Sequence, residues 1–172
     1  MAASVNKVAL PANSRLQGYI AAGDFIDCYA VASALDARAA ADIALNFPAW
    51  TRGLLALRNT LVAPFGLATD GSATQGLATE GATTGESESV EQIGLFPIDP
   101  TPAENTAPDE LLVGFNDKHL NFRISILATG HQVHLATWVH PHNLGGHLYL
   151  GLVMPFHIVI VRDALQRVAA AG

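Results

Sequence analysis

The stretch His119–His140, HLNFRISILATGHQVHLATWVH, decides the fold class of this chain. Every second residue from Leu120 to Ile126 is apolar, and the residues between them are polar. This alternation predicts a strand with one face in the core and one face in water. Ala128–Gly130 predicts a turn, after which a second strand returns from Gln132 to His140. The stretch therefore predicts an antiparallel hairpin.

A long helix is predicted after the hairpin. From Leu144 to Ala171 the chain has the composition of a helix about 40 Å long, at about 1.5 Å per residue, and Asn143 is suited to cap its first turn. Within it, residues 148–161 form the apolar run LYLGLVMPFHIVIV. That run is shorter than the roughly 18 residues that span a bilayer, so we expect a buried core helix and no membrane span.

The residues before the hairpin predict further elements of both kinds. Asp24–Ser33 alternates within an apolar run and predicts a strand buried on at least one face. Apolar residues at helical spacing then predict two short helices, at residues 33–47 and from Pro48 onward. Two more strands are expected, at residues 91–98 and 110–115. The order predicts an α+β domain in which an antiparallel sheet wraps around the long C-terminal helix.

Composition limits the organisation and the class of partner. A chain of 172 residues fits a single domain, residues 1–172, and lacks the dense Lys/Arg stripe that nucleic-acid binding requires. Residues 66–90 repeat GLATDG and GLATEG and contain no basic residue, which predicts a flexible Gly/Thr-rich acidic loop; a ligand-gating lid is the alternative. With Cys28 as its single cysteine and no secretory signal at its start, the chain is expected to be cytoplasmic.

Six short segments occur in order within the region from Asp24 to about Arg167: Pro48-x-Trp50, Ile93-Gly-Leu-Phe-Pro97, His119-Leu-x-Phe-Arg123, Val139-His-x-His-Asn143, Tyr149-Leu150 and Pro155-Phe-His157. This ordered set resembles the bacterial family known as domain of unknown function 2867. The resemblance implies an SRPBCC-type domain and no known reaction. The element order is likewise similar to the helix-grip fold of the START/Bet v 1-like superfamily, in which a hydrophobic cavity lies between sheet and C-terminal helix.

Histidines are concentrated in residues 131–147, which hold five of the seven in the chain. On an extended strand, the pair His140-Pro-His142 places both imidazoles on one face about 7 Å apart, within reach of one metal ion. His147 is then the candidate for a third ligand. The leading expectation is nevertheless that the protein holds no metal and no other cofactor.

Two other roles remain open for these histidines. His140, His142 and His157 could serve as acid/base groups if Tyr149 and Arg123 converge on them. In the structural alternative, His157 is a core imidazole bonded to a carbonyl or to a side chain of the sheet, and the other two histidines satisfy backbone groups where the last strand enters the helix.

The leading hypothesis is a domain that binds a small apolar or amphipathic molecule between the sheet and the C-terminal helix. One alternative is an enzyme that uses the histidines, and another is a structural domain that dimerises through an apolar helix face. The residues predicted to line the ligand site are Trp50, Leu54, Phe122, Arg123, Ile124, Trp138, His140, His142, Tyr149, Val153, Phe156 and His157.

Overall fold

A computed structural model describes residues 4–51, 92–93, 96–98, 109–116 and 120–172 of the chain. Its main sheet has five antiparallel strands in the order β1-β2-β7-β6-β5, and β3 and β4 pair separately. The protein is therefore α+β with an antiparallel sheet, as the sequence predicts. The strands are β1 (Asn6–Lys7), β2 (Phe25–Ala32), β3 (Gln92–Ile93), β4 (Phe96–Pro97), β5 (Glu110–Asn116), β6 (Leu120–Ala128) and β7 (Gln132–Pro141).

The predicted hairpin is confirmed as β6 and β7. Its register pairs Ala128 with Val133, and Gly130 takes a positive φ of 82° in the turn between them. Strand β2 pairs along the other edge of β7, with Phe25 opposite Val139. Because β2 and β7 lie about a hundred residues apart in the chain, local sequence signals cannot specify that pairing.

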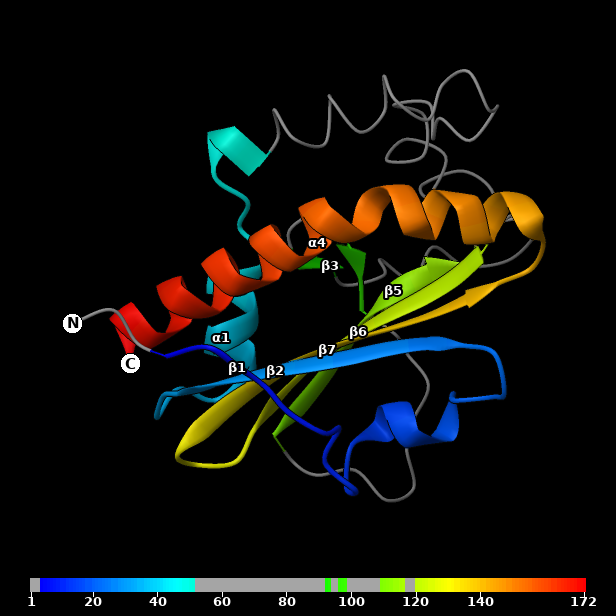
Figure 1. Cartoon of the computed structure of the whole chain (residues 1–172). Coiled ribbons are helices and arrows are strands. Elements are labelled where there is room, and N and C mark those ends of the chain that lie inside the picture. The colour runs from blue at the N-terminus through cyan, green and yellow to red at the C-terminus, as the bar shows by residue number, and fades with distance from the viewer. Residues whose placement is uncertain (1–3, 52–91, 94–95, 99–108, 117–119) are drawn as a thin grey trace, which may run out of the picture.

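Two helices cover one face of the sheet, which we call the inner face (Figure 1). Helix α4 (Leu144–Ala171) lies over β2 and β7, and α1 (Ala37–Ala44) lies beside its C-terminal end. The Asn143 side chain caps α4 by accepting from the Gly146 N–H at 3.0 Å. The core between these layers is formed by small and branched side chains, including Val31, Val113, Ile126, Leu135 and Leu165.

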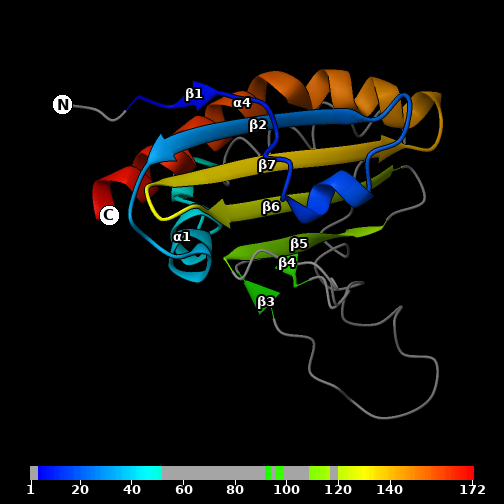
Figure 2. The same cartoon turned by 90° about the horizontal axis from the view of Figure 1, so that it is seen from below.

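The opposite, outer face of the sheet is covered too, which differs from the one wet face expected from the hairpin. The N-terminal segment with the 3₁₀ helix η1 (Arg15–Gly18) crosses it (Figure 2). Leu16 of that segment is fully buried, in one cluster with Cys28, Leu112 and Trp138. Apolar side chains therefore pack on both faces of the sheet. The packing on the outer face depends on the N-terminal segment, a contact that alternation within a single strand does not predict.

Helix α4 is less buried than its apolar sequence predicts. Its buried residues, apart from Gly146, begin at Val161, whereas Leu148 and Val159 are exposed. The helix is long and apolar enough to cross a membrane by length and composition, a test that core helices of soluble proteins also pass. The expectation of a buried helix thus holds only for its C-terminal part.

The first of the two predicted short helices is α1. It is capped by Asp36, whose side chain accepts from the Ala39 N–H at 2.7 Å, so the helix is shorter than the predicted residues 33–47. Residues 49–51 are helical, at the predicted start of the second helix. The continuation of that helix, including Leu54, and the loop predicted at residues 66–90 lie outside the described residues.

Candidate functional site

Two histidine–aspartate pairs lie on opposite faces of the sheet. Both carboxylates come from the start of the second strand, where Asp24 immediately precedes β2 and Asp27 lies within it. Because side chains alternate along a strand, residues three apart point to opposite faces. Asp24 therefore serves the outer face, where it meets His140, and Asp27 serves the inner face, where it meets His157.

The outer pair is built around a carboxylate with three hydrogen-bond donors. The Asp24 side chain is 1% exposed, and its Oδ1 accepts from Nδ1–H of His140 at 2.6 Å. Its Oδ2 accepts from Nε1–H of Trp138 at 2.7 Å and from the Ala21 N–H at 2.8 Å. Burial by itself raises the pKa of Asp24, but these hydrogen bonds outweigh it and leave the pKa lowered. The carboxyl is therefore held as an anion.

Aromatic and polar side chains surround His140 on the outer face. Its ring stacks on Trp138 at 6.2 Å between centroids, and the His142 ring is 5.5 Å away. Asn121 of β6 is directly opposite His140 in the register, and its buried Oδ1 has no hydrogen-bond partner in the part of the chain that the structure describes. Farther along the face, the Arg123 guanidinium lies 5.4 Å from the ring centroid of Tyr19. The His140 side chain remains 43% exposed.

The inner pair joins α4 to the sheet. Nε2 of His157 lies 3.1 Å and 3.2 Å from the two carboxylate oxygens of Asp27, whose side chain is 2% exposed. The His157 ring meets the edge of Phe25 at 6.3 Å. Thr137 is directly opposite Asp27 in the β2–β7 register, and its buried hydroxyl has no hydrogen-bond partner among the described residues. One neighbourhood of the inner layer thus contains a carboxylate, an imidazole and a hydroxyl.

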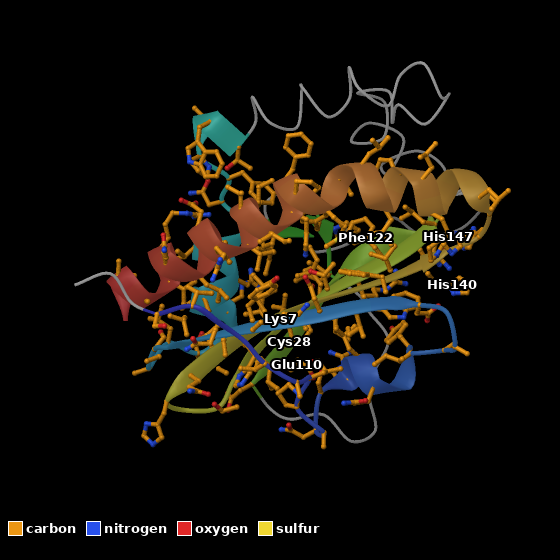
Figure 3. The ribbon with its side chains drawn as sticks, in the orientation of Figure 1. Lys7, Cys28, Glu110, Phe122, His140 and His147 are labelled. Atoms are coloured by element: carbon orange, nitrogen blue, oxygen red, sulfur yellow. The ribbon has the colours of Figure 1, made fainter. Side chains whose placement is uncertain are left out.

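Partly buried apolar groups flank this polar neighbourhood. Ile124 is directly opposite Thr137 on β6, and it packs against the main core. Rings of Phe47, Phe96 and Phe122 form a row with edge-to-face contacts at 6.1 Å and 5.7 Å. Figure 3 shows Phe122 between α4 and the sheet. The inner layer therefore combines incompletely buried apolar surface with a few polar atoms.

The structure divides the predicted ligand-lining residues between the two faces. Phe122, Ile124 and His157 belong to the inner layer, whereas Arg123, Trp138 and His140 lie on the outer face. Val153 is one helical turn before His157, on the same side of α4, and it is partly buried like Tyr149 and Phe156. The remaining residues are Trp50 and His142, which are exposed, and Leu54, outside the described residues.

The three histidines considered as metal ligands do not form a ligand set in the described part of the chain. His140 and His147 lie at the same end of the molecule (Figure 3), but Nδ1 of His147 donates to the backbone oxygen of Asn143 at 3.0 Å. Nδ1 of His140 is occupied by its hydrogen bond to Asp24. Among the described residues, no group of three or more His, Cys, Asp or Glu side chains is placed to hold a metal ion.

Sequence reasoning did not identify Asp24, Asp27 or Thr137. No acidic residue lies between His119 and Val161, so the carboxylates that pair with the histidines come from a strand distant in the sequence. The available signal was two aspartates in the otherwise apolar stretch DFIDCYAVAS, since buried acids are rare unless they are paired. His157, by contrast, is bonded to a side chain of the sheet, as its structural interpretation predicts.

Comparison with known protein families identifies a family for this chain. The family model described as "Protein of unknown function (DUF2867)" matches residues 20–164, which include both histidine–aspartate pairs. No curated protein and no solved structure matches the chain.

Proposed function

The chain belongs to the DUF2867 family, and we propose that it binds a small, neutral, amphipathic molecule between the inner face of the sheet and α4. We further propose that the domain is of the helix-grip type, because a long C-terminal helix lies over the five-stranded antiparallel sheet β1-β2-β7-β6-β5. In that architecture the space between helix and sheet is the natural place for an apolar ligand.

The unpartnered hydroxyl of Thr137 carries this proposal. A buried hydroxyl without a hydrogen bond costs about 1–3 kcal/mol, and such groups in native proteins call for a missing partner such as water or a ligand. Oγ1 of Thr137 is buried and has no partner within the described residues, and it lies on the face where His157 of α4 reaches the sheet. A polar end group of a bound molecule would supply the partner.

The apolar part of α4 before Val161 supports the same location. Val153 shares the His157 side of the helix and is only partly buried, as are Tyr149 and Phe156 beside it. Apolar surface that is left incompletely covered gains about 25 cal/mol per Å² when a ligand removes it from water. A ligand body lying along this part of α4 would therefore complete the burial that the polypeptide leaves unfinished.

Charge argues for a neutral ligand. Asp27 is buried beside Thr137, and a buried carboxylate repels a second anion at short range. Because His157 already donates to Asp27, the hydrogen-bonding groups left for a ligand are the Thr137 hydroxyl and the lone pairs of the Asp27 carboxylate that do not face His157. The end group that fits is a hydroxyl or an amine N–H, carried on an apolar body.

Fluorescence of N-phenyl-1-naphthylamine tests the proposal, because this probe is apolar, neutral and carries one N–H donor. Saturable enhancement is expected with the wild-type chain and should be lost in Val153→Trp, which fills the space on the His157 side of α4. The matched control Val159→Trp adds the same ring to the exposed side, where Val159 lies, and should bind normally. Equal binding by both variants would contradict an inner-layer site.

A further inference from the structure

We infer that Asp24 and His140 form a second site on the outer face, an acid–base site in which Nε2 of His140 accepts a proton from the hydroxyl group of a small substrate or of water. Asp24 is the positioning residue of this site and His140 its catalytic residue. The inference does not depend on ligand binding in the inner layer, because the sheet separates the two histidine–aspartate pairs.

The position of His140 is fixed by its carboxylate. Asp24 is itself held by Trp138 and the Ala21 N–H as well as by the imidazole, so all three bonds to its carboxylate constrain the geometry. A carboxylate that accepts from Nδ1–H sets the tautomer and leaves the lone pair at Nε2. It also stabilises the imidazolium that forms when Nε2 takes a proton. Both effects are those required of a general base.

The other ring nitrogen is available. His140 is 43% exposed, whereas Asp24 is 1% exposed, so the pair presents the imidazole to solvent and keeps the carboxylate inside. Among residues 4–51, 92–93, 96–98, 109–116 and 120–172, none makes a hydrogen bond to Nε2 of His140. This differs from the inner pair, where Nε2 of His157 is bonded to Asp27.

The surrounding groups indicate the chemical class of the substrate. In the Nδ1–H tautomer that Asp24 sets, Nε2 of His140 is a hydrogen-bond acceptor on an exposed ring. An acceptor calls for a molecule with a donor group, which a hydroxyl compound supplies. When the hydroxyl O–H bond breaks, the proton passes to Nε2, and the oxygen becomes able to attack an activated acyl group.

Hydrolysis of p-nitrophenyl acetate provides the probe reaction, with water as the hydroxyl compound. Water loses a proton to Nε2 as its oxygen bonds to the acyl carbon; the C–O bond to p-nitrophenolate then breaks, and Nε2 releases its proton to solvent. We expect His140→Gln to lower the rate about tenfold or more. The effect should be smaller than the roughly 100- to 10,000-fold that a general base contributes when a native substrate is held in position. His131→Gln, at an exposed hairpin residue, is the control and should hydrolyse the ester at the wild-type rate.

Testing the role of Asp24 requires a quantity that would not change if Asp24 only stabilised the fold. Long-range ¹H–¹⁵N spectra of the wild-type protein should show His140 in the Nδ1–H tautomer, and Asp24→Asn should shift it toward the Nε2–H tautomer and lower the hydrolysis rate. The tautomer of the wild-type protein can be measured even if the Asp24→Asn variant does not fold. An Nε2–H tautomer in the wild type, or a His140→Gln rate equal to that of the wild type, would overturn the inference.

Discussion

Asp24 and Asp27 lie three residues apart in the chain and bond histidines on opposite faces of one sheet. The outer contact to His140 is 2.6 Å and leaves the imidazole accessible, whereas the inner contact to His157 is 3.1 Å and lies under a helix. Strand alternation accounts for this division. Asp24 and the strand β2 that follows it thereby contribute to both proposed sites, the ligand site on the inner face and the acid–base site on the outer face.

The inner pair should be replaceable without loss of stability. His157→Leu alone leaves Asp27 buried without its charged partner, and we expect it to lower the free energy of unfolding by about 3 kcal/mol. The double variant Asp27→Val/His157→Leu removes both polar groups and should return to wild-type stability or exceed it by about 1–4 kcal/mol. Urea unfolding at pH 7 measures both. A double variant as unstable as the single one would show that the pair is needed for folding rather than for binding.

Acid should destabilise the protein partly through Asp24. Its hydrogen bonds lower its pKa below the ordinary value of 3.8, so the stabilisation is complete above pH 3.8 and is lost as the pH falls through the folded-state pKa. Asp24→Asn should therefore lose less stability than the wild type between pH 5 and pH 2. Asp109→Asn, at an exposed turn residue, is the control and should follow the wild-type curve. Parallel curves for wild type and Asp24→Asn would contradict the assignment.

The thiol of Cys28 should be unreactive in the native protein. Burial, with the neighbouring Asp27 carboxylate, raises its pKa from 9.0 to about 12. Iodoacetamide at pH 8 should therefore label it only through unfolding, at a rate that rises with urea. Because the unfolded thiol loses its proton near pH 9 and the folded one does not, stability should fall as the pH rises from about 9 toward about 12. Cys28→Ala should remove that alkaline component.

The cover of the outer face should depend on Glu110 of β5. Its buried carboxylate accepts from the Ser125 hydroxyl at 2.5 Å, the Ser14 hydroxyl at 2.7 Å and the Arg15 N–H at 2.7 Å. Glu110→Ala leaves these donors without an acceptor and should lower the free energy of unfolding by about 3 kcal/mol.

Hydrogen exchange can locate the effect of that substitution. Faster exchange is expected at residues 14–19, where η1 lies, with little change in α1. The control is Asp109→Ala, which alters the exposed neighbouring residue. Uniformly faster exchange throughout the sheet would contradict the claim that Glu110 holds only the N-terminal segment in place. Exchange at η1 that is as slow as in the wild type would contradict it too.

The sequence predicts the elements of this fold better than their contacts. Alternation from Leu120 to Ile126 and the turn at Gly130 specify the hairpin, because both signals are local. Leu16, by contrast, is buried in a cluster that includes Leu112 and Trp138, which lie far from it in the chain. No periodicity within their strands indicates that a segment near the N-terminus would cover them.

The candidate sites show the same limit. His140 and His157 could be selected from the sequence because histidines in an apolar context are conspicuous. Their partners could not be assigned, because the pairing of Phe25 with Val139, which brings Asp24 beside His140, is a long-range register. Alternation along β6 and β7, in contrast, is a local signal, and it places Arg123 and Trp138 on the outer face rather than in the inner layer to which the sequence hypothesis assigned them.

The central claim is most directly tested by methyl NMR during titration with N-phenyl-1-naphthylamine. We predict saturable shifts at the methyl groups of Ile124 and Val153, with no change at Leu16 and Leu112 of the outer cluster. The Val153→Trp variant should show no such shifts. Absence of saturable binding to the wild type, or shifts confined to Leu148 and Val159 on the exposed part of α4, would contradict ligand binding between the sheet and α4.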